Sequence, residues 1–295
     1  MEQTKLQSNI FDCALIFEGG GMRASYTAAV VNALLAEGIY FDHVYGVSAG
    51  SSNTVNYLSR DRMRTWESFT ALAADPHFGD WRTWLSGKGI FNAQWIYQEA
   101  GLPDGIIPFD FETFAANPAK LTIAGFERDT GRSCMWGRDD MQTLEDVMLH
   151  VRASSTLPVL MPAVKIDGQV CYDGGLAEGN GLLIPAAVAD GFSKFFIVRT
   201  RPKGFRKPEH PGPIVNFFWR YPHMQQALLE WGPGYNAMCD LAEQLEAEGR
   251  ALVVYAEDQM CENNTTDVEL LLRNYELGEA QAQRDLPKWK EFLGI

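Results

Sequence analysis

The stretch CALIFEGGGMRASYTAAVVNALLAEGIYFDHVYGVSAGSSNTVNYLS, residues 13–59, decides the fold. Its first nine residues form an apolar run that ends in consecutive glycines, which predicts a buried strand followed by a turn. Residues 22–38 carry apolar side chains at helical spacing, and Gly38 favours a helix end. A second strand (41–47) and a second helix (49–59) follow. Strand, helix, strand and helix within about fifty residues predict a parallel sheet with a crossover helix.

The remainder of the chain continues the alternation of strands and helices. Further strands are predicted at 120–128, at 133–137 (paired with the preceding one across a DTGR turn), at 163–175 (a hairpin that turns at Asp167-Gly168), at 194–200 and at 251–257. Helix N-caps are expected at Thr143, ahead of Asp146, and at Thr266, ahead of Glu269. The fold class is therefore α/β.

Residues 60–118 differ in character, because aromatic and proline residues are frequent there. We expect a helical insertion that packs on the sheet, with its rings in the core. The alternative is that the rings form the wall of a lipophilic pocket. The aromatic residues concerned are Trp66, Trp81, Trp84, Trp95, Phe109, Phe111 and Phe114.

The composition narrows the class of protein. A net charge of −13 argues against nucleic-acid binding, which needs clustered lysines and arginines. The sequence has no run of 18 apolar residues and no leader pattern, so neither a membrane span nor export is expected. The five cysteines form no C-x-x-C pair and are expected to be reduced thiols in the cytoplasm. No cysteine or histidine has a partner at metal-ligand spacing, so no metal and no cofactor is expected.

One basic stretch, VRTRPKGFRKP (198–208), runs against this acidic balance. A short run of like charges is usually a solvated surface, and we expect such a loop here. Its cations are Arg199, Arg201, Lys203, Arg206 and Lys207.

The first glycine-rich turn, Gly19-Gly20-Gly21-Met22-Arg23, is expected at the carboxyl end of a strand and the start of a helix. Backbone N–H groups that converge there form a cup for an anion. The anion is either the pyrophosphate of a dinucleotide or the oxyanion of an ester under attack. A dinucleotide site also requires an acidic residue at the end of the second strand. The nearby acid, Asp42, lies at the start of that strand, which disfavours a dinucleotide.

The second turn, Gly46-Val47-Ser48-Ala49-Gly50, is a G-x-S-x-G pentad, which presents a serine as a nucleophile. A serine needs a neighbouring base to become reactive. Asp173 follows a hairpin strand, and Gly174 and Gly175 permit its close approach to another loop. On the residues alone, histidine bases also remain open. The histidines after the serine are His77 in the aromatic insertion, His150 in a predicted helix, and His210 and His223 in proline-rich segments.

Taken in order, GGGMR (19–23), GVSAG (46–50) and DGG (173–175) resemble the motifs of the patatin-like phospholipases. The segment ASSTLPVLMPAV (153–164) also resembles the stretch ahead of the family's aspartate. Ala24 stands where the family often has glycine, a departure that leaves the anion cup intact. The resemblance implies a three-layer α/β/α fold with a mostly parallel central sheet.

The resemblance also implies a serine–aspartate dyad that uses no histidine. Ser48 would then be the nucleophile and Asp173 the general base. The backbone N–H groups around Gly20, Gly21 and Met22 would form the oxyanion hole, and Arg23 either assists the cup or forms a surface salt bridge. The implied activity is that of a lipid acyl hydrolase of the phospholipase A, lysophospholipase or esterase type, acting through an acyl-enzyme.

Two alternatives remain open. One is an α/β-hydrolase with a Ser-Asp-His triad, and the other is a non-catalytic lipid-binding protein. The expected partner is a lipid or a small acyl ester, peripheral membrane contact is compatible with it, and the oligomeric state is not predicted. We expect a catalytic domain at 12–200, which includes the insertion at 60–118, and a C-terminal extension at 201–295 packed on the same domain.

Overall fold

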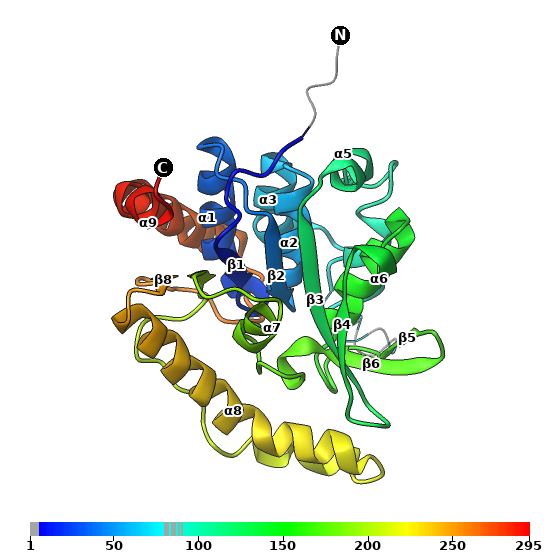
Figure 1. Ribbon diagram of the computed structural model, residues 1–295. Coiled ribbons are helices and arrows are strands. Elements are labelled where there is room, and N and C mark those ends of the chain that lie inside the picture. Colours follow the sequence, from blue (N-terminus) through cyan, green and yellow to red (C-terminus); the bar gives the residue numbers. More distant parts are fainter. Residues whose placement is uncertain (1–5, 80–82, 84–86, 88, 90) are drawn as a thin grey trace.

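The computed structural model describes residues 6–79, 83, 87, 89 and 91–295. Its centre is a sheet with the strand order β5-β6-β3-β2-β1-β7-β8, and β4 also pairs with β3 (Figure 1). The strands are β1 Ala14–Phe17, β2 His43–Val47, β3 Lys120–Glu127, β4 Ser133–Trp136, β5 Val164–Ile166, β6 Gln169–Asp173, β7 Phe195–Val198 and β8 Ala251–Val254.

The central part of this sheet is parallel, as the alternation of strands and helices predicts. The pairs β1–β2, β1–β7, β2–β3 and β7–β8 are parallel. The pairs β3–β4, β3–β6 and β5–β6 are antiparallel and lie toward one edge. Strands β1, β2, β7 and β8 are buried along their whole length, because helices cover both faces of the sheet.

The helices form two layers, one on each face (Figure 1). Residues of α1, α2, α5, α6 and α9 pack together with one side of the strands, and residues of α7 and α8 pack with the other. The three-layer α/β/α arrangement is therefore confirmed. The helices are α1 Ala24–Ala36, α2 Ala49–Leu58, α3 Arg62–Phe69, α5 Phe111–Ala116, α6 Leu144–Ser154, α7 Ile184–Ala189, α8 Pro222–Ala247 and α9 Val268–Leu293.

Several local predictions are confirmed by backbone geometry. Gly38 follows α1 with a φ of 65°, the left-handed conformation that ends many helices. Asp167 and Gly168, with φ of 50° and 81°, form the hairpin turn between β5 and β6. Thr143 and Asp146 form the expected capping box at the start of α6.

Two elements differ from the sequence-based expectation. The N-cap of α9 is Asp267 and not Thr266, because the Asp267 carboxylate accepts the N–H of Leu270. The long helix α8 was not predicted, since Pro233 lies between two glycines in its middle and suggests a break. Residues 60–118 contain short helices, as expected, but Trp81 and Trp84 lie outside the described residues.

Candidate active site

Ser48 occupies the sharp turn between β2 and α2. Its backbone has φ 54° and ψ −128°, a conformation that a residue with a side chain adopts at a cost of about 1–3 kcal/mol. The N–H of Ser48 donates to Oγ of Ser154 at 3.0 Å, which ties the turn to the end of α6. Strain of this kind at a strand-to-helix turn is the geometry that G-x-S-x-G pentads use to present a hydroxyl.

Gly46 and Gly50 allow α2 to begin this close to the sheet. A Cβ on Gly50 would lie 2.3 Å from the carbonyl oxygen of Phe17, and one on Gly46 would lie 2.3 Å from Oγ1 of Thr54. Real Cβ atoms do not approach other atoms so closely, so neither position accepts a side chain without movement of the backbone. The glycines of the pentad are thus explained by packing around the serine.

The register of the sheet sets Asp173 level with the serine turn. Val47 pairs with Ala124, and the next residue of β3, Gly125, pairs with Asp173. The carboxylate of Asp173 therefore lies two strands from Ser48 at the same height, and both residues line one cavity. Gly174 is required beside it, because a Cβ there would lie 2.1 Å from the carbonyl oxygen of Ala124.

The carboxylate of Asp173 is buried, and only one of its two oxygens accepts a hydrogen bond from a described residue. Its Oδ1 accepts the N–H of Gly175 at 2.7 Å, whereas Oδ2 has no hydrogen bond of standard geometry to any described residue. Burial raises the pKa of Asp173 to about 6, against the opposing effects of the Gly175 N–H, the Ser48 hydroxyl and the Lys207 charge. A carboxylate with such a pKa is a competent base near neutral pH.

The glycine-rich turn lies directly beside the serine. A Cβ on Gly19 would be 3.0 Å from Cβ of Ser48, and Gly21 has a φ of 57°. In the part of the chain that the structure describes, the N–H groups of Gly20 and Gly21 have no acceptor. The N–H of Met22 instead donates to the carbonyl of Asn263 at 3.0 Å.

The predicted set of anion-cup donors therefore needs a correction at its end. The Met22 N–H is engaged by Asn263, and the Arg23 N–H donates to the carbonyl of Gly20 at 3.3 Å. The Arg23 side chain forms an ion pair with Glu262, so its charge is compensated. Residues 262–263 lie after β8 in the sequence, and no local sequence pattern indicates that they contact this turn.

A buried ion pair supports the start of the turn. Arg199 lies 3.4 Å from Glu18, and both side chains are almost fully buried. The Glu18 carboxylate also accepts the hydroxyl of Tyr235 and the N–H of Thr200. Burial alone would raise the pKa of Glu18, but the Arg199 charge and these donors hold it below its ordinary value. The pair fixes β1 against β7 where both strands end.

An apolar pocket opens on one side of Ser48. Its empty space, open mouth included, is about 800 Å³. Phe78 and Phe91 belong to its wall and are buried. The wall is completed mainly by apolar side chains, which include Val55, Phe69, Leu72, Ile96, Ile107, Met148, Val151, Leu157 and Met161.

Both expectations for the aromatic insertion hold in part. Phe109 and Phe114 are core residues and Phe111 packs against them, which is the expected role. Trp66 and Trp95 also pack against buried clusters. The pocket wall is formed by other rings of the same segment, which the sequence analysis did not single out.

A second, polar pocket also reaches Ser48. Its lining includes Asp173, the glycine-rich turn, Arg201 and Lys207. Two aromatic residues of α8, Trp231 and Tyr235, complete it. Lys207, Trp231 and Tyr235 are not among the site residues that the sequence motifs predict. The basic stretch 198–208 could have drawn attention to Lys207. No local sequence pattern indicates that Trp231 and Tyr235 of α8 line the pocket that contains Ser48.

The histidines lie elsewhere. None of the five lines the apolar or the polar pocket. His150 lies in α6, as predicted, and is buried there, with Nδ1 at 2.7 Å from the carbonyl oxygen of Asp146. His77, His210 and His223 are exposed.

Neither a metal cluster nor a membrane span is found in the described ranges. No group of three or more His, Cys, Asp or Glu side chains there is arranged to hold a metal ion. Among the same residues, no helix has the length and apolar character needed to cross a membrane.

The chain is similar to known proteins in sequence and in fold. It is 24% identical over 200 residues to the uncharacterized protein YjjU of Escherichia coli (strain K12). The aligned region covers 64% of this chain and 52% of YjjU. The chain thus spans about half the length of that curated relative. Its fold is similar to that of VipD from Legionella pneumophila, with a TM-score of 0.51 and 12% identity over 94% of this chain and 67% of VipD.

Two family models match successive parts of the chain. The second, a domain of unknown function designated DUF6363, matches residues 221–294. The first describes patatin-like phospholipases and matches residues 15–186, which is more than half of the chain and contains all three motifs. The chain therefore belongs to the patatin-like phospholipase family.

Proposed function

We propose that the protein is a lipid acyl hydrolase that uses Ser48 as the nucleophile and Asp173 as the general base. Membership of the family supports hydrolysis of lipid esters. The observation that carries the finer proposal is the position of Ser48 on a strained turn, in one cavity with a buried carboxylate whose pKa is raised to about 6.

The proposed reaction proceeds in two halves. Asp173 takes the proton of the Ser48 hydroxyl while Oγ attacks the ester carbonyl, and the oxyanion accepts the N–H groups of Gly20 and Gly21. Protonated Asp173 then gives its proton to the departing alcohol, which leaves an acyl-serine. In the second half Asp173 takes a proton from water, the water oxygen attacks the acyl carbon, and the serine leaves with that proton.

The apolar pocket supplies the place for the acyl chain. It reaches Ser48 and is lined by aliphatic and aromatic side chains, which suit a hydrocarbon chain and exclude water from the reacting carbonyl. A lipid or a small acyl ester is therefore the proposed substrate.

Peripheral contact with a lipid surface is part of this proposal. Phe217 and Trp219, just ahead of α8, are exposed to 68% and 67%. Large apolar side chains that remain in water favour an interface between water and lipid. Cosedimentation of the Trp219→Gln variant with phosphatidylcholine vesicles tests the contact, and binding equal to that of the unaltered protein contradicts it.

Neither the histidine triad nor the non-catalytic lipid-binding protein accounts for the geometry of this site as well as the proposed dyad does. A histidine triad requires an imidazole within reach of Ser48, yet neither pocket that contains Ser48 is lined by a histidine. A non-catalytic lipid-binding protein has no need of a strained serine and a raised aspartate pKa together.

The first prediction concerns hydrolysis of p-nitrophenyl esters. Ser48→Ala and Asp173→Asn each lower kcat/KM by about 10⁴-fold or more, because each removes a group that acts in both halves of the reaction. The matched controls His210→Gln and His223→Gln stay within about threefold of the unaltered protein. An inactive His223→Gln beside an active Asp173→Asn establishes the triad instead. Failure of a fluorophosphonate to label Ser48 in the unaltered protein rejects catalysis altogether.

A further inference from the structure

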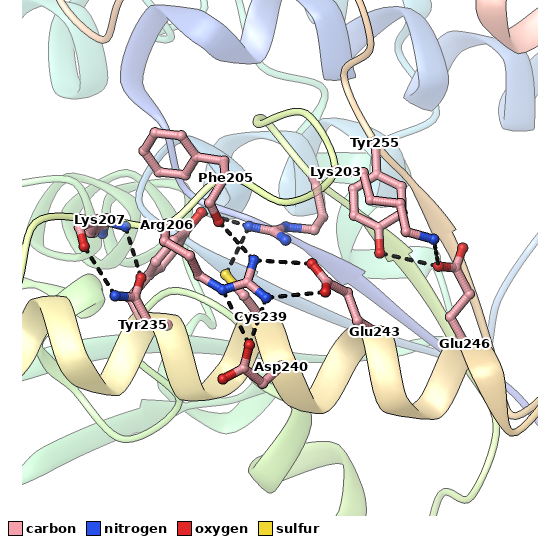
Figure 2. A network of polar contacts seen from close by, with 12 residues as sticks. Lys203, Phe205, Arg206, Lys207, Tyr235, Cys239, Asp240, Glu243, Glu246 and Tyr255 are labelled. Atoms are coloured by element: carbon pink, nitrogen blue, oxygen red, sulfur yellow. Dashed lines mark hydrogen bonds and ion pairs between the residues drawn. The ribbon is translucent and has the colours of Figure 1, made fainter.

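The basic stretch that follows β7 is not uniformly solvated. Three of its cations are compensated by carboxylates. Arg199 pairs with Glu18 inside the molecule. Lys203 pairs with Glu246, and Arg206 pairs with Asp240 and Glu243, all on α8 (Figure 2). The expectation of a solvated loop is therefore wrong for Arg199, which is fully buried, and holds only in part for Arg201 and Lys207, which are half-buried. Arg201 and Lys207 have no ion pair with any described residue, and both line the polar pocket beside Ser48.

Lys207 is held in place by α8. Its N–H donates to Oδ1 of Asn236 at 2.7 Å, and Nδ2 of Asn236 donates to its carbonyl at 3.0 Å. The ammonium nitrogen lies 4.0 Å from the ring centres of both Trp231 and Tyr235. Gly232 allows this approach, because a Cβ there would lie 2.2 Å from the carbonyl oxygen of Pro208. The ammonium is thus positioned by the backbone and by two aromatic rings.

The charges of the polar pocket do not balance. Glu18 is compensated by Arg199, and Arg23 by Glu262. Asp173 is the remaining acid in the lining, against Arg201 and Lys207. Burial lowers the pKa of Lys207 to about 8 despite the opposing charges of Glu18 and Asp173. Burial and the nearby charge of Arg23 lower the pKa of Arg201 as well. Both cations are thus partly desolvated, although neither forms an ion pair with a described residue.

Trp231, which lines the same pocket, carries a neutral donor without a partner in the described ranges. Nε1 of Trp231 is buried and has no hydrogen-bond partner among the described residues, although Trp231 lines the polar pocket. An ammonium, a guanidinium and an N–H donor together match a phosphate, which offers several acceptor oxygens and at least one negative charge.

We propose that the polar pocket binds a phosphate group on the alcohol side of the ester, so that the enzyme prefers esters whose leaving alcohol carries a phosphate. The inference rests on the proposed function, because the apolar pocket is taken to hold the acyl chain and Ser48 lies between the two. Lys207 and Arg201 pair with the phosphate, and Trp231 donates to it. Since Trp231, Tyr235 and Asn236 belong to the segment 221–294 matched by the DUF6363 model, that segment completes the substrate site.

The test compares two soluble esters that share one short acyl chain, a monoacylglycerol and the corresponding monoacylglycerol 3-phosphate. The unaltered protein is expected to show a kcat/KM at least about tenfold higher for the phosphate ester, since a charge-assisted hydrogen bond contributes roughly that factor or more. In Lys207→Met and in Arg201→Gln this ratio of kcat/KM values falls toward one. Lys203→Met, in the same stretch but exposed and paired with Glu246, is the matched control and keeps the ratio.

A second measurement separates a bound headgroup from a free anion. Glycerol 3-phosphate is expected to inhibit hydrolysis of p-nitrophenyl butyrate competitively, with an inhibition constant about tenfold higher in Lys207→Met. Inorganic phosphate is the second arm. Inhibition by inorganic phosphate without any preference for the phosphate ester overturns the proposal, since the pocket then binds a free anion. An unchanged ratio in Lys207→Met and Arg201→Gln that melt like the unaltered protein also overturns it. The proposed function fails separately, if neither ester is hydrolysed and Ser48 is not labelled.

Discussion

At the scale of single residues, Asp173 carries a cost for the fold. Its pKa is raised to about 6 by burial, so the folded state disfavours the charged carboxylate relative to the unfolded chain. Because the folded pKa lies above the unfolded one, stability is full at pH values below the unfolded pKa. It declines as the pH rises through about 6. The residue proposed as the base therefore weakens the protein in the pH range where it works.

Asp173→Asn is expected to raise the free energy of unfolding at pH 8 by up to about 3 kcal/mol, since about two pKa units correspond to that energy. The gain shrinks toward zero near pH 3, below the unfolded pKa, where the carboxyl is mostly protonated in both states. Urea denaturation at the two pH values measures it. Asp104→Asn, at an exposed position, is the matched control and changes stability by less than about 0.5 kcal/mol at either pH. Equal stability of Asp173→Asn and the unaltered protein at pH 8 contradicts the prediction.

The sequence indicates which residues meet at this candidate site better than it indicates their hydrogen bonds. Ser48, Asp173 and the glycines stand in short motifs whose backbone geometry is local, so a single sequence specifies them. The engagement of the Met22 N–H depends on Asn263, far along the chain, and the position of Lys207 depends on Asn236. Such contacts form only when distant segments pack, and no local pattern encodes them.

At the scale of elements, the start of α2 is fixed by its closeness to β1. Helix propensity favours alanine over glycine by about 1 kcal/mol. At Gly50, however, a Cβ would lie 2.3 Å from the carbonyl oxygen of Phe17, so the backbone must shift. We expect Gly50→Ala to lower the free energy of unfolding by about 2–4 kcal/mol, in the direction opposite to propensity.

Gly137→Ala serves as the control for Gly50→Ala. A Cβ at Gly137 would meet the carbonyl oxygen of Leu121 at 3.6 Å, an ordinary contact. Its effect in urea denaturation should stay within about 0.5 kcal/mol. A stabilised Gly50→Ala variant would mean that α2 can move away from β1.

Helix α8 shows why an element escapes prediction. Gly232, Pro233 and Gly234 in its middle are the residues that usually interrupt helices. Gly232 has a tertiary reason to be there, since Pro208 packs against its backbone, and a Cβ on Gly234 would lie 2.6 Å from the side chain of Asn180. Tertiary packing thus outweighs local propensity. By contrast β1, β2 and α1, whose apolar pattern is strong and local, were predicted correctly in type.

At the scale of the whole molecule, the C-terminal third builds the same layers as the rest. Strand β8 extends the sheet beside β7, α8 covers one face and α9 covers the other (Figure 1). Trp289 of α9 is buried in the core. Gln281 of α9 also contacts Tyr26 of α1. We propose that residues 12–200 and the extension 201–295 fold as one cooperative unit.

A chain ended after Arg220 should therefore not reach a native state. It lacks β8, α8 and α9, so apolar side chains on both faces of the sheet are left in water. Circular dichroism during heating is expected to show no cooperative transition for the shortened chain and a single one for the full chain. A shortened chain that melts cooperatively assigns the extension a folding unit of its own.

The meeting of two pockets at Ser48 also bears on the order in which products leave. After the first half of the proposed reaction, the alcohol occupies the polar pocket and the acyl group remains bonded to the serine. When the alcohol departs, the polar pocket becomes free, and this pocket suits water better than the apolar one does. Water can therefore reach the acyl-serine while the acyl chain stays in the apolar pocket. In the proposed reaction the fatty acid is therefore the last product to leave, and its chain leaves through the apolar pocket.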